Sequence, residues 1–364
     1  MKIILPSNSL LSSLLALSLR NSCDCEITIK NETPKSFGRF YSLNYFSKNF
    51  LDSISVWELL DKSKITPYKK IQIYKNTKKT IEFDVSDVGI DYLGYIINED
   101  DLVKTISTKL FENQEIKKSE KQILSEGKND LNIISNYSDI CSSKDLISFA
   151  LKEYSQTAIN ITLQHSEDNM RIPRQIFYED EILGFLPLDN NSYNLIWSMP
   201  NHTFNKIGSS NSKEYITLIE SRINSQFGDI EDIQIGNSFP LSSRHANPYY
   251  YNNSLLIGDS AHKFHPLAGL GLNMGIEDIS VLTTLISSNQ SIKKIMNEYC
   301  IQRMNRNLSL QKLLDIIISF HSSKIIPTDY QIKILKLFNK TFFLKPYIIS
   351  NATGLNNYIY SNNR

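Results

Sequence analysis

Apolar residues open the chain in a pattern that predicts a strand followed directly by a helix. Lys2–Leu5 reads KIIL, a short apolar strand, and the leucine-rich segment Leu10–Leu19 follows after the turn PSNS. Glu26–Lys30 (EITIK) predicts a second strand. A nucleotide-binding βαβ unit begins in this order, but its turn normally contains glycines, and this turn has none.

The same opening also resembles a secretory leader. A Met-Lys start precedes a Leu/Ser-rich run and then Cys23 and Cys25. However, Pro6–Ser9 interrupts the apolar run, and a strand pattern follows where a leader would be cleaved. We therefore favour the interpretation that this segment belongs to the fold.

Further along, sheet and helix periodicities alternate. Residues 70–74 and 80–85 alternate with period two around a short polar turn, which predicts a hairpin. Further strands are expected at residues 92–97, 157–164, 174–178, 184–188 and 194–198, and helices in the second half of residues 33–60, at 99–111, at 214–227 and after 275. A βαβ beginning interrupted by sheet segments and resumed near the last third predicts two discontinuous domains with a crevice between them.

Composition excludes several classes of protein. The 364 residues suffice for about two domains. Lys and Arg total 39 against 38 Asp and Glu, so we expect no nucleic-acid partner. Cys23, Cys25, Cys141 and Cys300 match neither a metal spacing nor a disulfide framework, which predicts reduced thiols, no bound metal and a cytoplasmic location. No apolar run approaches the roughly 20 residues that cross a bilayer.

Residues 255–285 carry the strongest chemical signal. An apolar strand (Leu255–Ile257) leads into a Gly258-Asp259 turn, a loop rich in proline and glycine, and an apolar helix. Backbone N–H groups of a glycine-containing loop at the start of a helix suit a partly anionic ligand. A carboxylate such as Asp259 is a good acceptor for sugar-like hydroxyls. Asn273, at the expected helix start, fits either an N-cap or a ligand contact.

The run GDSAHKFHPLAGLGLNMGIEDISVL resembles the second flavin-contacting motif of the class A aromatic-ring flavin monooxygenases, and most closely that of the ubiquinone-biosynthesis hydroxylases. Other segments resemble this family in the same order along the chain. They are Arg39 with Ser42-Leu43, LGYIINEDDL (residues 93–102), EYSQTAI (153–159), FLPL (185–188), FPLSSRHA (239–246) and Tyr299–Asn307. The resemblance implies the p-hydroxybenzoate hydroxylase fold.

That fold is α/β, a Rossmann-like FAD-binding domain interwoven with an antiparallel-sheet substrate domain and followed by C-terminal helices. The expected boundaries are residues 1–68, 90–150 and 240–320 for the FAD-binding domain, 69–89 and 151–239 for the substrate domain, and 321–364 for the helical segment.

The resemblance also implies roles for individual residues. Asp259 would hold the ribityl chain of FAD, beside Gly258, and Arg39 would lie near the pyrophosphate. Backbone donors for the flavin ring would come from the loop comprising Pro266, Ala268, Gly269, Leu270, Gly271, Leu272 and Asn273. Relatives carry Gln where this chain has Leu270. No catalytic residue is implied, and His262 and His265 are interpreted as loop-packing residues.

The N-terminal flavin fingerprint departs from the family. Pro6, Asn8 and Leu11 stand at the glycine positions of G-x-G-x-x-G, and Lys30 stands where the ribose-binding acid is expected, with Glu32 two residues later. The Asp-Gly expected within residues 135–139 is missing. Loss of two phosphate contacts costs about 3–6 kcal/mol. Side-chain donors on Ser7, Asn8 and Ser9 would recover part of this.

Two functions compete on these observations. The first is an FAD-dependent monooxygenase, reduced by NAD(P)H, that hydroxylates the aromatic ring of a polyprenylated ubiquinone precursor. The second is a flavin-deficient relative that serves as a binding or scaffold component of ubiquinone biosynthesis. Both imply a lipophilic quinone-precursor ligand and a quinone-biosynthesis protein complex as partners.

The C-terminal tail offers a further surface. Residues 330–349 intersperse Lys333, Lys336, Lys340 and Lys345 with Ile, Leu and Phe. This pattern is typical of a basic amphipathic helix at the inner face of a membrane, and equally of a core-packed helix with solvated lysines.

Overall fold

The computed structural model describes residues 1–121, 124–125, 127–140, 147–166, 171–208, 210–223, 228–341 and 344–355. Cys141, residues 224–227 of the helix expected at 214–227 and residues 356–364 of the expected C-terminal segment lie outside the described residues.

The N-terminal βαβ unit forms as its pattern predicts. β1 (Lys2–Leu5) pairs in parallel with β2 (Glu26–Lys30) on one side and with β9 (Asp130–Ile134) on the other. The helix α1 (Leu10–Ser22) joins β1 to β2. The sheet has the order β15-β16-β9-β1-β2-β8, completed by β8 (Lys117–Ser119), β15 (Tyr250–Tyr251) and β16 (Ser254–Leu256). The first strand of the chain therefore lies inside the sheet.

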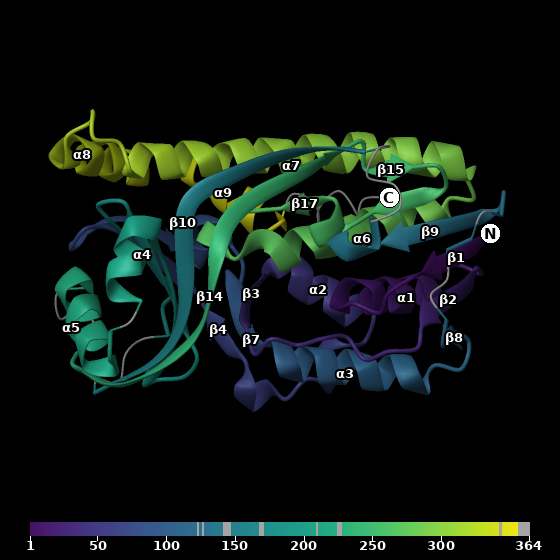
Figure 1. Cartoon of the computed structure of the whole chain (residues 1–364), viewed down its shortest axis with the longest axis horizontal. Helices are drawn as coiled ribbons and strands as arrows, with labels where there is room; N and C mark the ends of the chain where they lie inside the picture. Colours follow the sequence, from purple (N-terminus) through teal and green to yellow (C-terminus); the bar gives the residue numbers. More distant parts are fainter. Residues whose placement is uncertain are drawn as a thin grey trace.

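A second, larger sheet occupies the other end of the molecule (Figure 1). Its longest strands are the antiparallel pair β10 (Ser148–His165) and β14 (Ile230–Asn247), two 18-residue strands near one edge that arch from the lower left of Figure 1 to the upper side. The order is β17-β14-β10-β13-β12-β11-β5-β6, with β17 (His262–Lys263), β13 (Ser192–Pro200), β12 (Glu181–Pro187), β11 (Arg174–Tyr178), β5 (Lys70–Lys75) and β6 (Lys78–Asp84).

A small third sheet lies between the two larger ones (Figure 1). β7 (Gly94–Asn98) pairs with β3 (Phe40–Asn44) and with β4 (Thr66–Tyr68), in both cases antiparallel. β3 leads directly into α2 (Tyr45–Ser53), whose N-cap Asn44 accepts a hydrogen bond from the Ser47 backbone N–H. The helical pattern expected in the second half of residues 33–60 is thus realised as a helix of nine residues preceded by a strand.

Long helices cover the first sheet, and shorter ones cover the second. Figure 1 shows α7 (Ile292–His321) along the full upper side and α3 (Glu99–Glu112) along the lower side, with α1 and α6 (Leu270–Ser287) between them. The remaining helices are α4 (Asn201–Ile207), α5 (Ser212–Ile223), α8 (Thr328–Asn339) and α9 (Leu344–Ala352).

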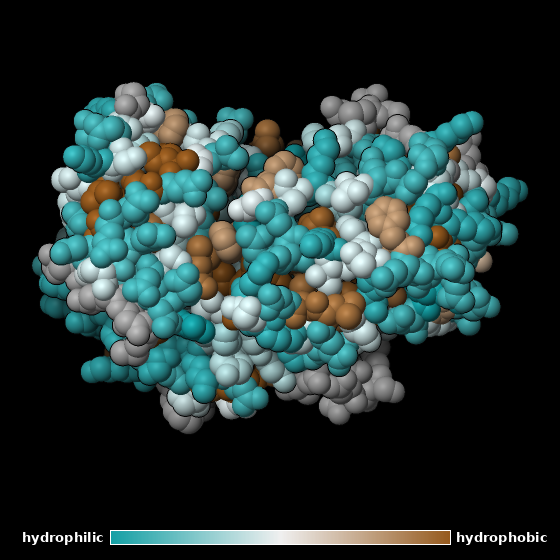
Figure 2. Space-filling model, turned by 90° about the horizontal axis from the view of Figure 1, so that it is seen from below, coloured by the Kyte–Doolittle hydropathy of each residue, from teal (hydrophilic) through white to brown (hydrophobic). Residues whose placement is uncertain are grey.

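The sheets have separate hydrophobic cores. One cluster buries β1, β2, β9 and the inner faces of α1, α2, α6 and α7, whereas another gathers side chains of β10–β13 with α5. This is the expected α/β class, with an antiparallel sheet inserted between parts of a Rossmann-like unit. Among the described residues, no helix is long and apolar enough to span a bilayer. On the face seen in Figure 2, hydrophilic residues predominate and hydrophobic ones gather in separate patches.

Candidate functional site

The Gly258-Asp259 turn follows β16 and is hydrogen-bonded to α6. The Gly258 N–H donates to Oδ2 of Asp278 at 2.9 Å, and Gly258 has a φ of +55°, a conformation that glycine adopts without strain. The Ser260 hydroxyl donates to the carbonyl of Ile134 at the end of β9. Asp259 between them is exposed, so the turn presents one carboxylate to solvent.

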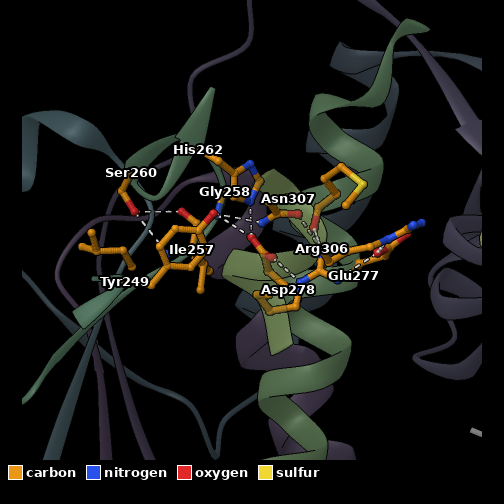
Figure 3. A network of polar contacts seen from close by, with 12 residues as sticks. Tyr249, Ile257, Gly258, Ser260, His262, Glu277, Asp278, Arg306 and Asn307 are labelled. Atoms are coloured by element: carbon orange, nitrogen blue, oxygen red, sulfur yellow. Dashed lines mark hydrogen bonds and ion pairs between the residues drawn. The ribbon is translucent and has the colours of Figure 1, made fainter. Parts of the chain in front are cut away.

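Asp278 is the centre of the buried polar network in Figure 3. Its Oδ2 lies 2.6 Å from Nε2 of His262, and its Oδ1 accepts from Nε of Arg303 at 2.7 Å. Arg303 also donates to Glu277 at 2.9 Å. Burial opposes ionisation of Asp278, but His262 and Arg303 outweigh it and lower the pKa of Asp278 to about 2. The network therefore fixes the Gly258-Asp259 turn to α6 and α7.

The start of α6 is open to a ligand. Gly269 caps the helix with a φ of +60°, and a Cβ atom added to Gly271 would meet nothing within 4 Å. Both glycines are exposed. Because the first N–H groups of a helix have no intrahelical acceptor, Leu270, Gly271 and Leu272 can offer donors at the positive end of an 18-residue helix.

Asn273 lies inside α6, so the alternative that it caps this helix is wrong. Its Oδ1 accepts from the Asn44 N–H at 2.9 Å and from the Ser47 hydroxyl at 2.8 Å. Its Nδ2 donates to the carbonyls of Ser42 and Gly269. The side chain thus ties α6 to β3 and α2, and its amide is fully used within the protein. The helix starts at Leu270, earlier than the glycine-rich sequence predicts, because Gly269 supplies the cap.

Arg39 is held at the edge of the same region by Glu99. The Nε atom of Arg39 lies 3.5 Å from Oε2 of Glu99, and the Arg39 side chain is 51% exposed, with its guanidinium over the Phe37 ring. Buried Glu99 also accepts from the Tyr41 hydroxyl at 2.6 Å. Burial raises the pKa of Tyr41, which interacts with the charges of both Arg39 and Asp259.

The two motif histidines are buried and bonded within the protein. His262 contacts Asp278 as described above, and His265 accepts from the Leu267 N–H at 3.2 Å. His265 also packs edge-on against Tyr154, with ring centroids 4.9 Å apart. Burial lowers the pKa of His265 to about 4. This environment agrees with their interpretation as loop-packing residues.

The degenerate fingerprint at the start of α1 is bonded to the end of β2. The Asn8 N–H donates to Oε1 of Glu32 at 3.1 Å, and the Asn8 side-chain amide donates to the Glu32 carbonyl. Ser13 donates to the Asn8 side chain. Ser7 is 5% exposed, and its hydroxyl has no hydrogen-bond partner in the described structure. Ser7 therefore keeps a free polar group for a ligand, whereas Asn8 does not.

Leu11 and Ser135 fill the neighbouring positions. Ser135 opens the segment in which the Asp-Gly is missing, and its hydroxyl lies 2.7 Å from that of Ser9 and 2.8 Å from that of Ser12. The Leu11 side chain covers the bare backbone of Gly258 and Gly275, where an added Cβ at Gly275 would lie 2.6 Å from Leu11 Cδ1. The bulky leucine at the third fingerprint position thus packs into space left by two other glycines.

A flavin dinucleotide fits one half of this region. Exposed Asp259 and the open start of α6 match the ribityl chain and the ring, which need an acceptor and backbone donors. The start of α1 does not match the adenosine diphosphate half, because Asn8, Ser9, Leu11 and Glu32 bond and pack with residues of the chain itself.

Sequence reasoning missed Glu99, Asp278 and Arg303. The segments GIED (residues 275–278) and Tyr299–Asn307 resemble the hydroxylase family, but nothing in their spacing predicts that they contact each other. Glutamate and arginine on helices ordinarily indicate a solvated face. Only their burial, at 3%, 0% and 3% exposure, identifies them as supports of the site.

Comparison with known proteins shows which family the chain resembles. A family model described as an FAD binding domain matches residues 130–303. The chain is similar to 3-demethoxyubiquinol 3-hydroxylase of Escherichia coli, at 22% identity over 97% of this chain and 98% of that protein. It is also 23% identical to the mitochondrial ubiquinone biosynthesis monooxygenase COQ6 of Xenopus tropicalis, over 81% of this chain and 78% of that protein.

These similarities support an FAD-dependent aromatic-ring monooxygenase. Solved structures of this class share its fold. p-Nitrophenol 4-monooxygenase PnpA of Pseudomonas putida superposes with a TM-score of 0.76 at 11% identity, covering 97% of this chain and 98% of that one. HpxO of Klebsiella pneumoniae, in complex with FAD and uric acid, gives a TM-score of 0.70 at 13% identity, covering 96% and 97%. The expected family and fold class are confirmed.

Proposed function

We propose that this monooxygenase hydroxylates the aromatic ring of a polyprenylated ubiquinone precursor, with FAD as cofactor and NAD(P)H as reductant. The observation that carries the proposal is the exposed Asp259 carboxylate on a rigid turn next to the open start of α6. Similarity to ubiquinone-biosynthesis hydroxylases supports this function over the flavin-free scaffold considered above. Association with other quinone-biosynthesis proteins stays a prediction.

A bound flavin supplies the redox chemistry that activates oxygen for insertion into an aromatic ring. The residues of this chain bind and orient it. Asp259 would accept hydrogen bonds from ribityl hydroxyls, and the N–H groups of Gly271 and Leu272 would donate to the carbonyl groups of the ring. Arg39, placed by Glu99, would contribute positive charge at the rim.

An apolar cluster suits the lipophilic part of the substrate. It lies between the large sheet, the loop before α6 and α7, and consists of buried Phe177, Ile182, Phe264, Leu267, Met274 and Leu314. These buried apolar side chains exclude water and contribute no acid or base themselves. Orientation and exclusion of water are what this reaction requires from the protein.

The first experiment is an absorbance spectrum of the purified protein after incubation with excess FAD and removal of unbound flavin, followed by FAD titration of the wild type and Asp259→Ala. We expect visible flavin bands, and a 10- to 100-fold weaker affinity in the variant, because a hydrogen bond to a charged group contributes about 1.5–3 kcal/mol. Asp232→Ala, an exposed carboxylate on β14, is the control and should bind like the wild type. A folded protein that stays colourless under excess FAD contradicts the proposal.

Contact with a membrane surface is part of the proposed function. Along one side of α8, the side chains of Tyr330, Ile334 and Leu337 are 61%, 49% and 68% exposed. These positions repeat at i, i+4 and i+7 and so form one stripe. Exposed Lys333 and Lys336 lie next to the stripe on the same helix, and exposed Lys340 is its C-cap. This combination is typical of helices that lie in the interface of an anionic bilayer.

A further inference from the structure

The carboxylate of Glu32 sits at the start of α1, where a nucleotide-binding fold normally receives a phosphate. Its Oε1 accepts the Asn8 backbone N–H at 3.1 Å, and its Oε2 lies 2.7 Å from Nζ of Lys30. A backbone N–H at a helix start and an ammonium group are also the contacts that a phosphate takes in such a site. The chain thus provides its own anion for this position.

The charge of Glu32 is maintained by these contacts. Partial burial opposes ionisation, but the Lys30 ammonium and the Asn8 N–H lower the pKa of Glu32 below its usual value. The carboxylate is therefore negative at neutral pH. A second anion at the same N–H would be repelled by it and would also have to displace it.

Neighbouring side chains also keep a phosphate away from the start of α1. Asn8 itself is 5% exposed and is bonded on both sides, to Glu32 and to Ser13. The hydroxyl of Ser9 caps α1 by accepting the Ser12 N–H at 3.1 Å. Leu11 covers the approach from the Gly258-Asp259 turn, where a ribityl chain would continue toward a diphosphate.

We propose that Glu32 is the resident anion of the α1 start, so that the cofactor is held by its flavin and ribityl half and its adenosine diphosphate half adds little affinity. That the flavin and ribityl half binds at all rests on the proposed function. The inference predicts that this enzyme discriminates poorly between FAD and FMN, whereas a site whose fingerprint binds the diphosphate would prefer FAD.

Equilibrium titrations with FAD, FMN and ADP test the inference on the full-length wild-type protein. We expect dissociation constants for FAD and FMN within about threefold of each other, and no displacement of FAD by millimolar ADP. FAD binding at least about 30-fold tighter than FMN overturns the inference, because each charge-assisted phosphate contact contributes about tenfold or more. Displacement of FAD by ADP overturns it as well.

The variant Glu32→Ala should open the site. With the carboxylate removed, the Asn8 N–H and Lys30 become free for a phosphate, and we expect FAD to bind at least about tenfold more tightly while FMN changes little. Glu26→Ala is the matched control, because Glu26 lies at the opposite end of β2 and is paired with Lys117 at 2.9 Å. Unchanged FAD and FMN affinities in a folded Glu32→Ala protein overturn the inference. Glu32→Gln, which keeps an oxygen acceptor without the charge, serves if the alanine variant does not fold.

Failure of the proposed function gives a different result. A wild-type protein that binds neither flavin and does not bind ADP defeats the hydroxylase proposal but upholds the closed diphosphate site. A protein that binds FAD far more tightly than FMN upholds the hydroxylase and defeats the inference.

Discussion

The Nε2 atom of His262 lies 2.6 Å from Oδ2 of Asp278, and both side chains are almost completely buried. The same carboxylate accepts the Gly258 N–H and the Arg303 guanidinium. One residue of α6 thereby joins the turn that carries Asp259, the loop that follows it and the long helix α7. The position of the exposed Asp259 depends on a residue that never touches solvent.

Replacing Asp278, the centre of this network, should lower the free energy of unfolding. In Asp278→Asn, the buried Arg303 loses one of its two charged partners and keeps Glu277, and we expect a loss of about 3 kcal/mol in the free energy of unfolding. Urea denaturation followed by circular dichroism measures it. Asp329→Asn, with an 81% exposed carboxylate 3.9 Å from Lys78, should change stability by less than about 0.5 kcal/mol. Equal effects of the two substitutions would show that the network carries no stability.

A buried histidine should make the protein sensitive to mild acid. Burial, together with the charge of Lys75, lowers the pKa of His321 to about 3, and its ring stacks on Phe177 at 3.5 Å between centroids. Since the unfolded state binds a proton near pH 6.5, the stability from neutral His321 is full above that pH and is lost as pH falls toward 3.

Comparison of His321→Gln with the wild type isolates this contribution. Between pH 7 and pH 5 the wild type should lose about 2 kcal/mol more than the variant, measured by urea unfolding at each pH. His202→Gln, at an exposed position of α4, should follow the wild type. An identical pH dependence of wild type and His321→Gln contradicts the prediction.

Leu11 and Gly275 should be energetically coupled. A Cβ at Gly275 would lie 2.6 Å and 2.9 Å from the two Cδ atoms of Leu11, so Gly275→Ala forces the leucine to move. After Leu11→Ala the space is free, and Gly275→Ala should then stabilise the protein by about 1 kcal/mol through helix propensity. A double-mutant cycle on thermal unfolding tests this. Additive effects would mean that Leu11 does not occupy the space between the glycines.

The stripe on α8 should bind anionic vesicles. We expect the wild type to float with liposomes that contain about 30% anionic lipid, and Leu337→Glu to reduce the bound fraction about tenfold, because it removes an apolar contact and adds a negative charge. Leu59→Glu changes a leucine that is 58% exposed outside α8 and should float like the wild type. Binding that survives Leu337→Glu would exclude this surface.

Local patterns were sufficient for much of the fold. The strand–turn–strand of β5 and β6, the strands β1 and β2 around α1, and the exposed Asp259 after β16 follow from alternation, helical periodicity and turn chemistry between near neighbours in the chain. The family was also recognisable from the ordered motif around Gly258. Boundaries were less predictable: β10 extends to Ser148, because it pairs with β14 along its whole length.

Which polar groups of the site are free and which are bonded depends on contacts between residues far apart in the chain. Glu32 reaches back 24 residues to Asn8, Arg303 reaches 25 residues to Asp278, and Ser135 meets Ser12 across 123 residues. A polar side chain has the same pattern in the sequence whether it faces water or a buried partner, since burial is set by the elements packed around it. The motif therefore predicted a flavin site, while only the packed chain showed that the start of α6 is open and that the start of α1 is bonded to the protein's own side chains.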